Sequence, residues 1–295
     1  MQDIRCFNVF IDIAIFLGVE AIVLFPFFYD VLEFLPVRDT GFRCDDTDIQ
    51  YPYTESIIPK LYVLVGAYAI AIFYLVGEIL FYCCYTRNKD RDTPACIPCG
   101  CYVHLILVNI WRTIGFHIFA VNLTYIFVIL GKKMVGRLRP NFLDICQANT
   151  TLYDCSEGWV DDSVCTGNDD LIEEAKESFP SYDASIVFCV AVYFVLYLEA
   201  RWLWRGVGLM KPFIQAACLL GACFMSLLGV YQNAHFLSDA IAGAVLGGGI
   251  AVMTVFYFTS LFGSSHKRRL KREDEVEMNN YVVTNRNSAW VEQKM

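Results

Sequence analysis

The sequence predicts an all-α, polytopic membrane protein with six transmembrane helices. Of its 295 residues, 56% are hydrophobic and only 18% are charged, which is more apolar than a typical soluble domain. The hydrophobic residues also gather into blocks about 20 residues long, the length that a helix needs to cross the hydrocarbon core. The six blocks are 7–30, 58–85, 102–131, 184–204, 207–231 and 238–262.

These blocks predict one six-span domain over residues 1–262, followed by a tail at 263–295. The first block lacks a basic segment before it and a small-residue cleavage site after it, so we interpret it as a retained span rather than a signal peptide. The last block contains a glycine-rich run at 243–249, which we expect to pack helices closely because it lies in hydrocarbon. The tail is charged and then polar, and we expect it to be disordered.

The charges of the linkers predict how the chain is oriented. The linkers at 86–101 and 201–211 and the start of the tail are basic, which is typical of the cytosolic side. The linkers at 33–57 and 140–180 are acidic and are expected to face outward or into a lumen. Both termini are therefore expected in the cytosol of an integral protein of the plasma membrane or an endomembrane.

The acidic linkers also carry features of an oxidising compartment. Four cysteines lie in them: Cys44, Cys146, Cys155 and Cys165. A disulfide between Cys146 and either Cys155 or Cys165 would close the 140–180 loop. Asn149 begins the sequence Asn-Thr-Thr in the same loop and is a plausible glycan acceptor.

A second group of cysteines lies in the predicted cytosolic linker, where CIPCGCYVH occupies residues 96–104. Three cysteines near a histidine suggest zinc, but a second CxxC pair is missing and His104 starts a span. Acylated juxtamembrane cysteines and inert thiols are the alternatives. We therefore predict no metal site.

A basic cluster lies where the charge pattern predicts an outward face. The third block ends in GKKMVGRLRPNF, and its basic residues are Lys132, Lys133, Arg137 and Arg139. Interfacial snorkelling of long side chains explains the cluster, but so does an anion site, because guanidinium donors fit phosphate oxygens in pairs. Two more polar segments, 178–183 and 230–243, are expected on the same face. These positions predict an outward-facing site at the ends of spans three to six.

Both of these segments resemble helix starts. In 178–183, Ser181 or Asp183 can cap free backbone N–H groups after Pro180. In 230–243, His235 and Asp239 stand four residues apart, so their side chains can meet on one helical turn. A carboxylate beside an imidazole would fix its tautomer and raise its basicity, as a nucleophile or base needs. A capped helix end with a satisfied histidine would give the same pattern.

Together the three segments resemble the lipid phosphate phosphatases of the type 2 phosphatidic acid phosphatase superfamily. The resemblance covers about residues 5–262. The family's first motif, KxxxxxxRP, is matched in full from Lys132 to Pro140. The second, PSGH, reads PSYD at 180–183, and the third, SRxxxxxHxxxD, reads LGVYQNAHFLSD at 228–239.

This resemblance implies hydrolysis of phosphate monoesters, with His235 attacking phosphorus and Asp239 orienting it. The implied phosphate-binding residues are Lys132, Arg139, Ser181 and Tyr182. No metal or other cofactor is needed in the family, so the positive charge must come from the protein. The resemblance also implies a lipid phosphate and the membrane as partners and a homo-oligomeric state, with no role for nucleic acid.

The departures from the motifs fall where the family's chemistry takes place. Asp183 stands where the family has the histidine that protonates the leaving group, so it is the candidate acid of this chain. Gly229 replaces the third-motif arginine, Leu228 its serine, and Tyr182 the glycine beside the phosphate. Loss of a positioned acid costs a factor of about 10²–10⁴ in rate, and loss of one charge-stabilising donor costs about 10²–10³.

Three hypotheses follow from these departures. The first is a protein that recognises phosphatidate, lysophosphatidate or sphingosine 1-phosphate but has impaired catalysis. The second is an active, metal-independent lipid phosphate phosphatase that works through His235. The third is a membrane scaffold or transport protein. Phosphate release separates the second from the others, and lipid binding without release separates the first from the third.

Overall fold

The structure is a computed structural model that describes residues 41–83, 105–148, 158–202, 208–259 and 261–262, together with residues 14, 17 and 18. Several predicted features lie outside these residues. They are most of the first apolar block, Asn149, Cys155, the cysteine run at 96–101 and the tail at 263–295.

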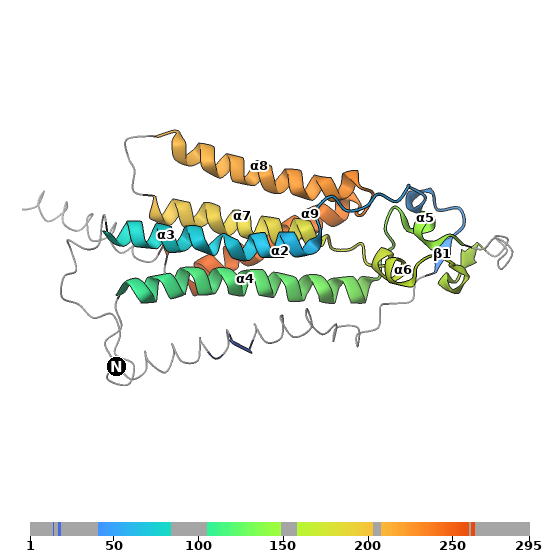
Figure 1. Ribbon diagram of the computed structural model, residues 1–295, viewed down its shortest axis with the longest axis horizontal. Helices are drawn as coiled ribbons and strands as arrows, with labels where there is room; N and C mark the ends of the chain where they lie inside the picture. The colour runs from blue at the N-terminus through green and yellow to red at the C-terminus, as the bar shows by residue number, and fades with distance from the viewer. Residues whose placement is uncertain are drawn as a thin grey trace, which may run out of the picture.

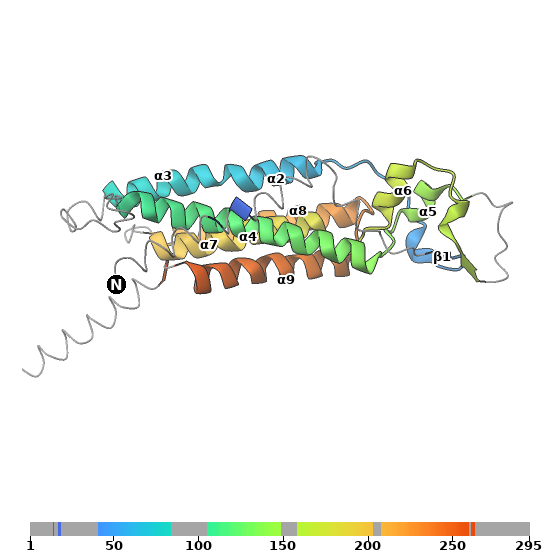
Figure 2. The ribbon, with the colours of Figure 1, turned by 90° about the horizontal axis from the view of Figure 1, so that it is seen from below.

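Five predicted spans are confirmed as helices that are long and apolar enough to cross a membrane. They run roughly parallel along one bundle (Figures 1 and 2). The helices are α2 (Lys60–Ala69) with α3 (Ala71–Phe81), α4 (Leu105–Val135), α7 (Tyr182–Arg201), α8 (Met210–Tyr231) and α9 (Leu237–Met253), which continues as a π-helix over Thr254–Phe258. The protein is therefore a polytopic, all-α membrane protein.

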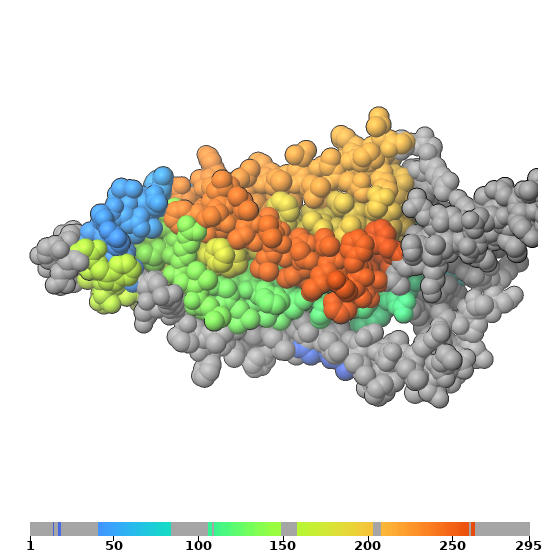
Figure 3. Space-filling view, turned by 180° about the vertical axis from the view of Figure 1, so that it is seen from behind, coloured from blue at the N-terminus to red at the C-terminus, as the bar shows by residue number. Residues whose placement is uncertain are grey.

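Helix α7 is the centre of this bundle, because it packs against α2, α4, α8 and α9. Its contact with α9 depends on two glycines of the 243–249 run. A Cβ atom at Gly243 would lie 2.6 Å from the carbonyl oxygen of Ser181, and one at Gly247 would collide with the carbonyl oxygen of Ser185. Figure 3 shows α9 lying between α8 and α4 on this side of the bundle. The prediction that this run packs helices closely is confirmed.

A small folded unit, which we call the cap, covers one end of the bundle (Figure 1). It comprises residues 41–59, 136–148 and 158–180. Its elements are β1 (Phe42–Arg43), paired antiparallel with β2 (Trp159–Val160), the short helices α5 (Phe142–Cys146) and α6 (Asp169–Ala175), and 3₁₀ turns at Thr47–Ile49 and Asp162–Val164.

Disulfide bonds hold the cap together. Of the two partners that the sequence left open for Cys146, the structure pairs it with Cys165. Cys44 is disulfide-bonded as well. Buried Phe42 packs against Phe142 with ring centroids 5.9 Å apart, so the cap has its own small apolar core.

Candidate functional site

The three polar segments come together where the cap meets the bundle. The backbone N–H of Ser178 donates to the carbonyl oxygen of Arg137 at 2.8 Å, which joins the second segment to the first. The N–H of Ser181 donates to the carbonyl oxygen of Asp239 at 3.1 Å, which joins the second segment to the third. The ends of α4, α7 and α9 therefore meet at one place.

His235 lies in the turn between α8 and α9, and only 4% of its surface is exposed. Its Nδ1 lies 2.8 Å from the backbone oxygen of Ser178. Because a carbonyl oxygen can only accept, Nδ1 carries the proton and Nε2 keeps its lone pair. Burial lowers the pKa of His235 well below its usual value, and the positive charges of Lys132 and Arg139 lower it further. At neutral pH the imidazole is therefore neutral and nucleophilic at Nε2.

Among the described residues, no direct hydrogen bond joins Asp239 to His235, although their spacing predicted that the two side chains can meet. Helix α9 begins at Leu237 and Phe236 is its N-cap residue, so His235 lies before the helix and the one-turn spacing does not apply. Asp239 is fully buried and accepts a hydrogen bond from the N–H of Phe236 at 3.3 Å. It also forms an ion pair with Arg137 at 2.5 Å.

Ser178 links the two residues instead. Its hydroxyl donates to Asp239 Oδ2 at 2.6 Å, while its backbone oxygen accepts from His235. Asp239 is therefore connected to His235 through a serine that is itself fully buried. The sequence placed Ser178 only at the start of a polar segment, because no motif position marks it.

Two basic residues of the first motif lie near His235. Lys132, at the end of α4, is 2% exposed and donates to the backbone oxygen of Glu177 at 2.5 Å. Arg139 is 7% exposed and donates through Nη2 to Glu174 at 3.1 Å. Its Nε is buried and has no hydrogen-bond partner among the described residues. That donor is available to an anion.

Sequence reasoning missed Lys60 and Glu174, which complete this cationic group. Lys60 begins α2, and its amino group pairs with Glu174 Oε1 at 2.7 Å, so one carboxylate is shared by Lys60 and Arg139. Burial raises the pKa of Glu174, but Lys60 and Arg139 outweigh that effect and bring the pKa down to about 2. Glu174 is therefore ionised at any physiological pH. A charged residue at a span end was the only signal in the sequence for Lys60.

The second motif combines helix capping with a buried carboxylate. Ser181 is the N-cap of α7, where its side chain accepts from the N–H of Ala184 at 3.4 Å. Asp183 interacts electrostatically with Lys60, Lys132 and Arg139. Its Oδ1 is buried and has no hydrogen-bond partner among the described residues. The carboxyl group of Asp183 therefore lies among the same cations that a phosphate would need.

Tyr182 has a different position from the one expected for a phosphate-binding side chain. It is 4% exposed and packs edge-on against Tyr125, with ring centroids 6.1 Å apart, as part of the bundle core. Its backbone N–H lies in the first turn of α7, where N–H groups lack acceptors within the helix. Only this backbone group is suited to contact an anion.

Position 229 lies beside the imidazole. A Cβ atom on Gly229 would sit 3.4 Å from Cδ2 of His235, the ring carbon next to Nε2, and would meet no other atom within 4 Å. The family's arginine at this position would therefore reach the reacting edge of the ring, and the glycine here leaves that place without charge.

Comparison with known proteins assigns the chain to a family. The model of the PAP2 superfamily matches residues 113–262, a range that contains all three segments. The chain belongs to this superfamily, among the lipid phosphate phosphatases.

Relatives of this phosphatase-family chain include two kinds of curated protein. It is 31% identical over 288 residues to phospholipid phosphatase-related protein type 1 of Danio rerio, covering 92% of this chain and 84% of the relative. It is 27% identical over 240 residues to phospholipid phosphatase 1 of Mus musculus, covering 80% of each. No solved structure matches the chain.

Proposed function

We propose that this protein recognises lipid phosphates of the phosphatidate, lysophosphatidate and sphingosine 1-phosphate class on the outer or lumenal face of a membrane, and hydrolyses them poorly or not at all. One observation carries the proposal. The cations around His235 already interact with acidic side chains of the same chain, because Lys60 and Arg139 pair with Glu174 and Asp183 takes the place of the family's histidine acid.

The arrangement around His235 supports a retained capacity for attack. The imidazole is neutral and its Nδ1 donates to the carbonyl oxygen of Ser178. Nε2 is therefore the nitrogen that keeps a lone pair for attack. Lys132 and Arg139 provide charge for the phosphoryl oxygens, and the buried Nε of Arg139, which has no hydrogen-bond partner in the described part of the chain, provides a directed donor. These groups suit the binding of a phosphate monoester.

Two steps lack their usual support. Asp183 replaces the histidine that protonates the leaving alcohol in the family, and whenever its carboxyl group is ionised its charge opposes a phosphate that approaches the same cations. Gly229 provides no charge next to Nε2. Either loss alone is expected to slow turnover by about two orders of magnitude, although such effects need not add.

An active phosphatase is the second candidate. The unprotonated Nε2 of His235 favours it, as does the similarity to phospholipid phosphatase 1. In that case a protonated Asp183 would act as the acid, because its buried Oδ1 has no partner among the described residues.

Phosphate release tests these two functions directly. The purified protein would be given phosphatidate, lysophosphatidate and sphingosine 1-phosphate without added metal, and inorganic phosphate would be measured alongside lipid binding. Our proposal expects binding with little release. Sustained release that is abolished by Asp183→Asn would favour the active phosphatase, and absence of both binding and release would favour a scaffold or transport role.

Restoring the family residues provides a second test. Asp183→His, Leu228→Ser and Gly229→Arg together should raise turnover by at least about two orders of magnitude, the contribution of one general acid. Tyr182 is kept, because its ring is part of the core. The gain should vanish when His235→Ala is added. A folded triple variant with no gain would mean that the missing residues are not what limits catalysis.

A further inference from the structure

We propose that an apolar groove between α2, α7 and α8 holds one hydrocarbon chain of the lipid whose phosphate lies at the site described above. The proposal rests on the proposed function, because it takes the phosphate group to be anchored near His235. It assigns the chain, the other half of the ligand, to particular residues of the bundle.

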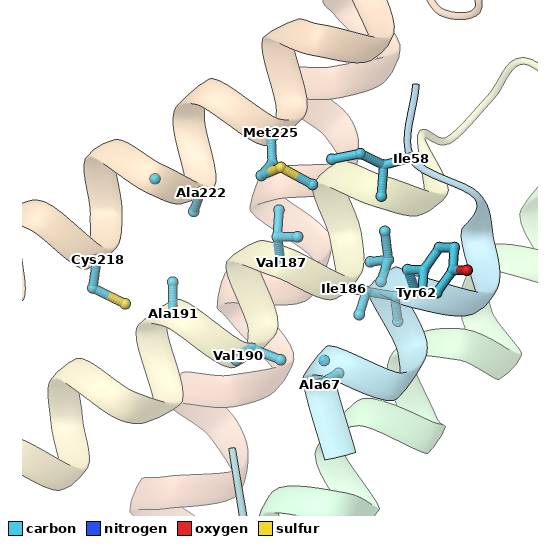
Figure 4. Close-up of a pocket in the computed structure, with 13 residues that line it drawn as sticks. Ile58, Tyr62, Ala67, Ile186, Val187, Val190, Ala191, Cys218, Ala222 and Met225 are labelled. Carbon is cyan, nitrogen blue, oxygen red and sulfur yellow. The ribbon is translucent and has the colours of Figure 1, made fainter. Parts of the chain in front are cut away.

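The groove is a cavity of about 300 Å³ with almost wholly apolar walls. Ile58 and Tyr62 form its α2 side, Ile186 and Val190 its floor on α7, and Cys218 and Met225 are among the residues that form its α8 side (Figure 4). A methylene takes up about as much space as a water molecule, roughly 30 Å³, so the groove has room for on the order of ten methylenes. That volume fits part of one chain.

Two walls of the groove lead directly to the site. On α7, Ile186 follows Asp183 by three residues, and on α8, Met225 precedes Gly229 by four. Residues at these spacings lie on the same face of a helix, about one turn apart. Asp183 is among the cations of the site, and Gly229 is beside the imidazole. The groove therefore begins about one turn from the place where a phosphate would bind.

The third wall leads to the same place. Ile58 and Tyr62 flank Lys60 at the start of α2, and Lys60 pairs with Glu174. A lipid with its phosphate between Lys60 and His235 could pass its chain directly between these α2 side chains and α7. The polar end and the apolar groove thus match the two halves of one amphipathic molecule.

The glycines of the groove differ from those that pack helices. At Gly243 and Gly247 a Cβ atom would collide with α7, whereas at Gly66 and Gly221 it would meet nothing within 4 Å. Glycines in membrane helices commonly allow close helix contact, and that reason does not apply to Gly66 and Gly221. Their small size instead hollows the surface between α2 and α8.

Photolabelling tests where the chain lies. The full-length protein in lipid nanodiscs would be labelled with lysophosphatidate that carries a diazirine midway along its acyl chain, and with the matching monoacylglycerol, which lacks phosphate. We expect lysophosphatidate to label peptides that contain Ile186 and Met225, and to do so several times more strongly than the monoacylglycerol.

Filling the groove gives the matched variant. Gly221→Leu adds four carbon atoms, about 120 Å³ at roughly 30 Å³ each, and should reduce labelling of these peptides at least about fivefold. Gly249→Leu is the control, because Gly249 is also an exposed helix glycine without neighbours within 4 Å, but it lies on α9 outside the groove. This control should label like the unmodified protein.

The outcomes separate the two proposals. If lysophosphatidate binds better than the monoacylglycerol but labels other peptides, or if Gly221→Leu has no effect, the groove is not the chain site and the proposed function stands. If both probes label the groove equally, the groove accepts any chain, and phosphate recognition is refuted. Labelling of the groove by neither probe overturns the inference.

Discussion

Replacing Glu174 with Gln should tighten the binding of phosphorylated lipids. In the structure one carboxylate oxygen of Glu174, Oε1, pairs with both Lys60 at 2.7 Å and Arg139 at 3.1 Å. A phosphate held by the same two cations from the other side would lie about 6 Å from that carboxylate. Two unit negative charges at this distance repel by about 0.7 kcal/mol in bulk water and by about 3 kcal/mol at an effective dielectric constant of 20.

The exposure of Glu174 decides where in this range the effect falls. Its side chain is 37% exposed, so solvent screens much of the repulsion. We therefore expect Glu174→Gln to lower the Kd for lysophosphatidate by about threefold to tenfold, towards the weaker end of that range. The two lost ion pairs should cost at most about 1 kcal/mol of stability each.

The assay is equilibrium binding of lysophosphatidate by the purified protein, with the matching monoacylglycerol as the uncharged ligand. Glu173→Gln is the control, because Glu173 is the neighbouring exposed acidic residue of α6. This substitution removes the same charge without changing a partner of Lys60 or Arg139. Unchanged or weaker lysophosphatidate binding in Glu174→Gln would refute competition. It would mean that Glu174 positions the two cations for the ligand rather than occupying them.

Three further predictions concern topology, charge and pH. Asn149→Gln should remove a glycan and lower the mass of the protein made in a glycosylating host; absence of a glycan from the unmodified protein would contradict the outward placement of the 140–180 loop. Lys132→Ala should weaken lipid-phosphate binding by about 1.5–3 kcal/mol, the range for charge-assisted hydrogen bonds, and leave binding of the neutral lipid unchanged; equal binding of both lipids by the unmodified protein would exclude an anion site. The free energy of unfolding should fall as pH drops below about 6.5, because the unfolded chain lets His235 take up a proton that its lowered pKa excludes in the folded state. The loss should continue below about 4.5. There Glu174, whose pKa is about 2 in the folded state, takes up a proton only on unfolding. Melting temperatures at pH 7.5, 6, 5 and 4 would measure this, and His235→Gln should flatten the step between pH 6.5 and 5.

The spans were predictable because hydrocarbon imposes a simple rule on composition. Blocks of apolar residues of membrane length had to be helices, and the predicted 207–231 differs from the observed Met210–Tyr231 only at its start. The sequence could not choose a partner for Cys146, because both candidate cysteines lie in the same loop. The pairing with Cys165 depends on how the cap folds around its own core.

The motif residues of the site could be picked out from the sequence, but their connections and the two further members Lys60 and Glu174 could not. Motif spacing identified His235 and Asp239, yet the helical rule that linked them fails because α9 starts only after His235. Lys60 and Glu174 are 114 residues apart in the chain, and nothing in the sequence indicates that they meet. Pairing of distant charges is a property of the tertiary fold, which a single sequence does not specify residue by residue.

The contact between α7 and α9 separates the positions that hold this protein together from those that determine its chemistry. Gly247 admits no side chain at all, and the bond from Ser181 to the backbone of Asp239 fixes the relative height of the two helix starts. Position 229 lies beside the imidazole of His235, but a Cβ atom there would meet only one neighbouring atom. A charged side chain at position 229 would therefore change the surroundings of His235 without disturbing the contact between α7 and α9.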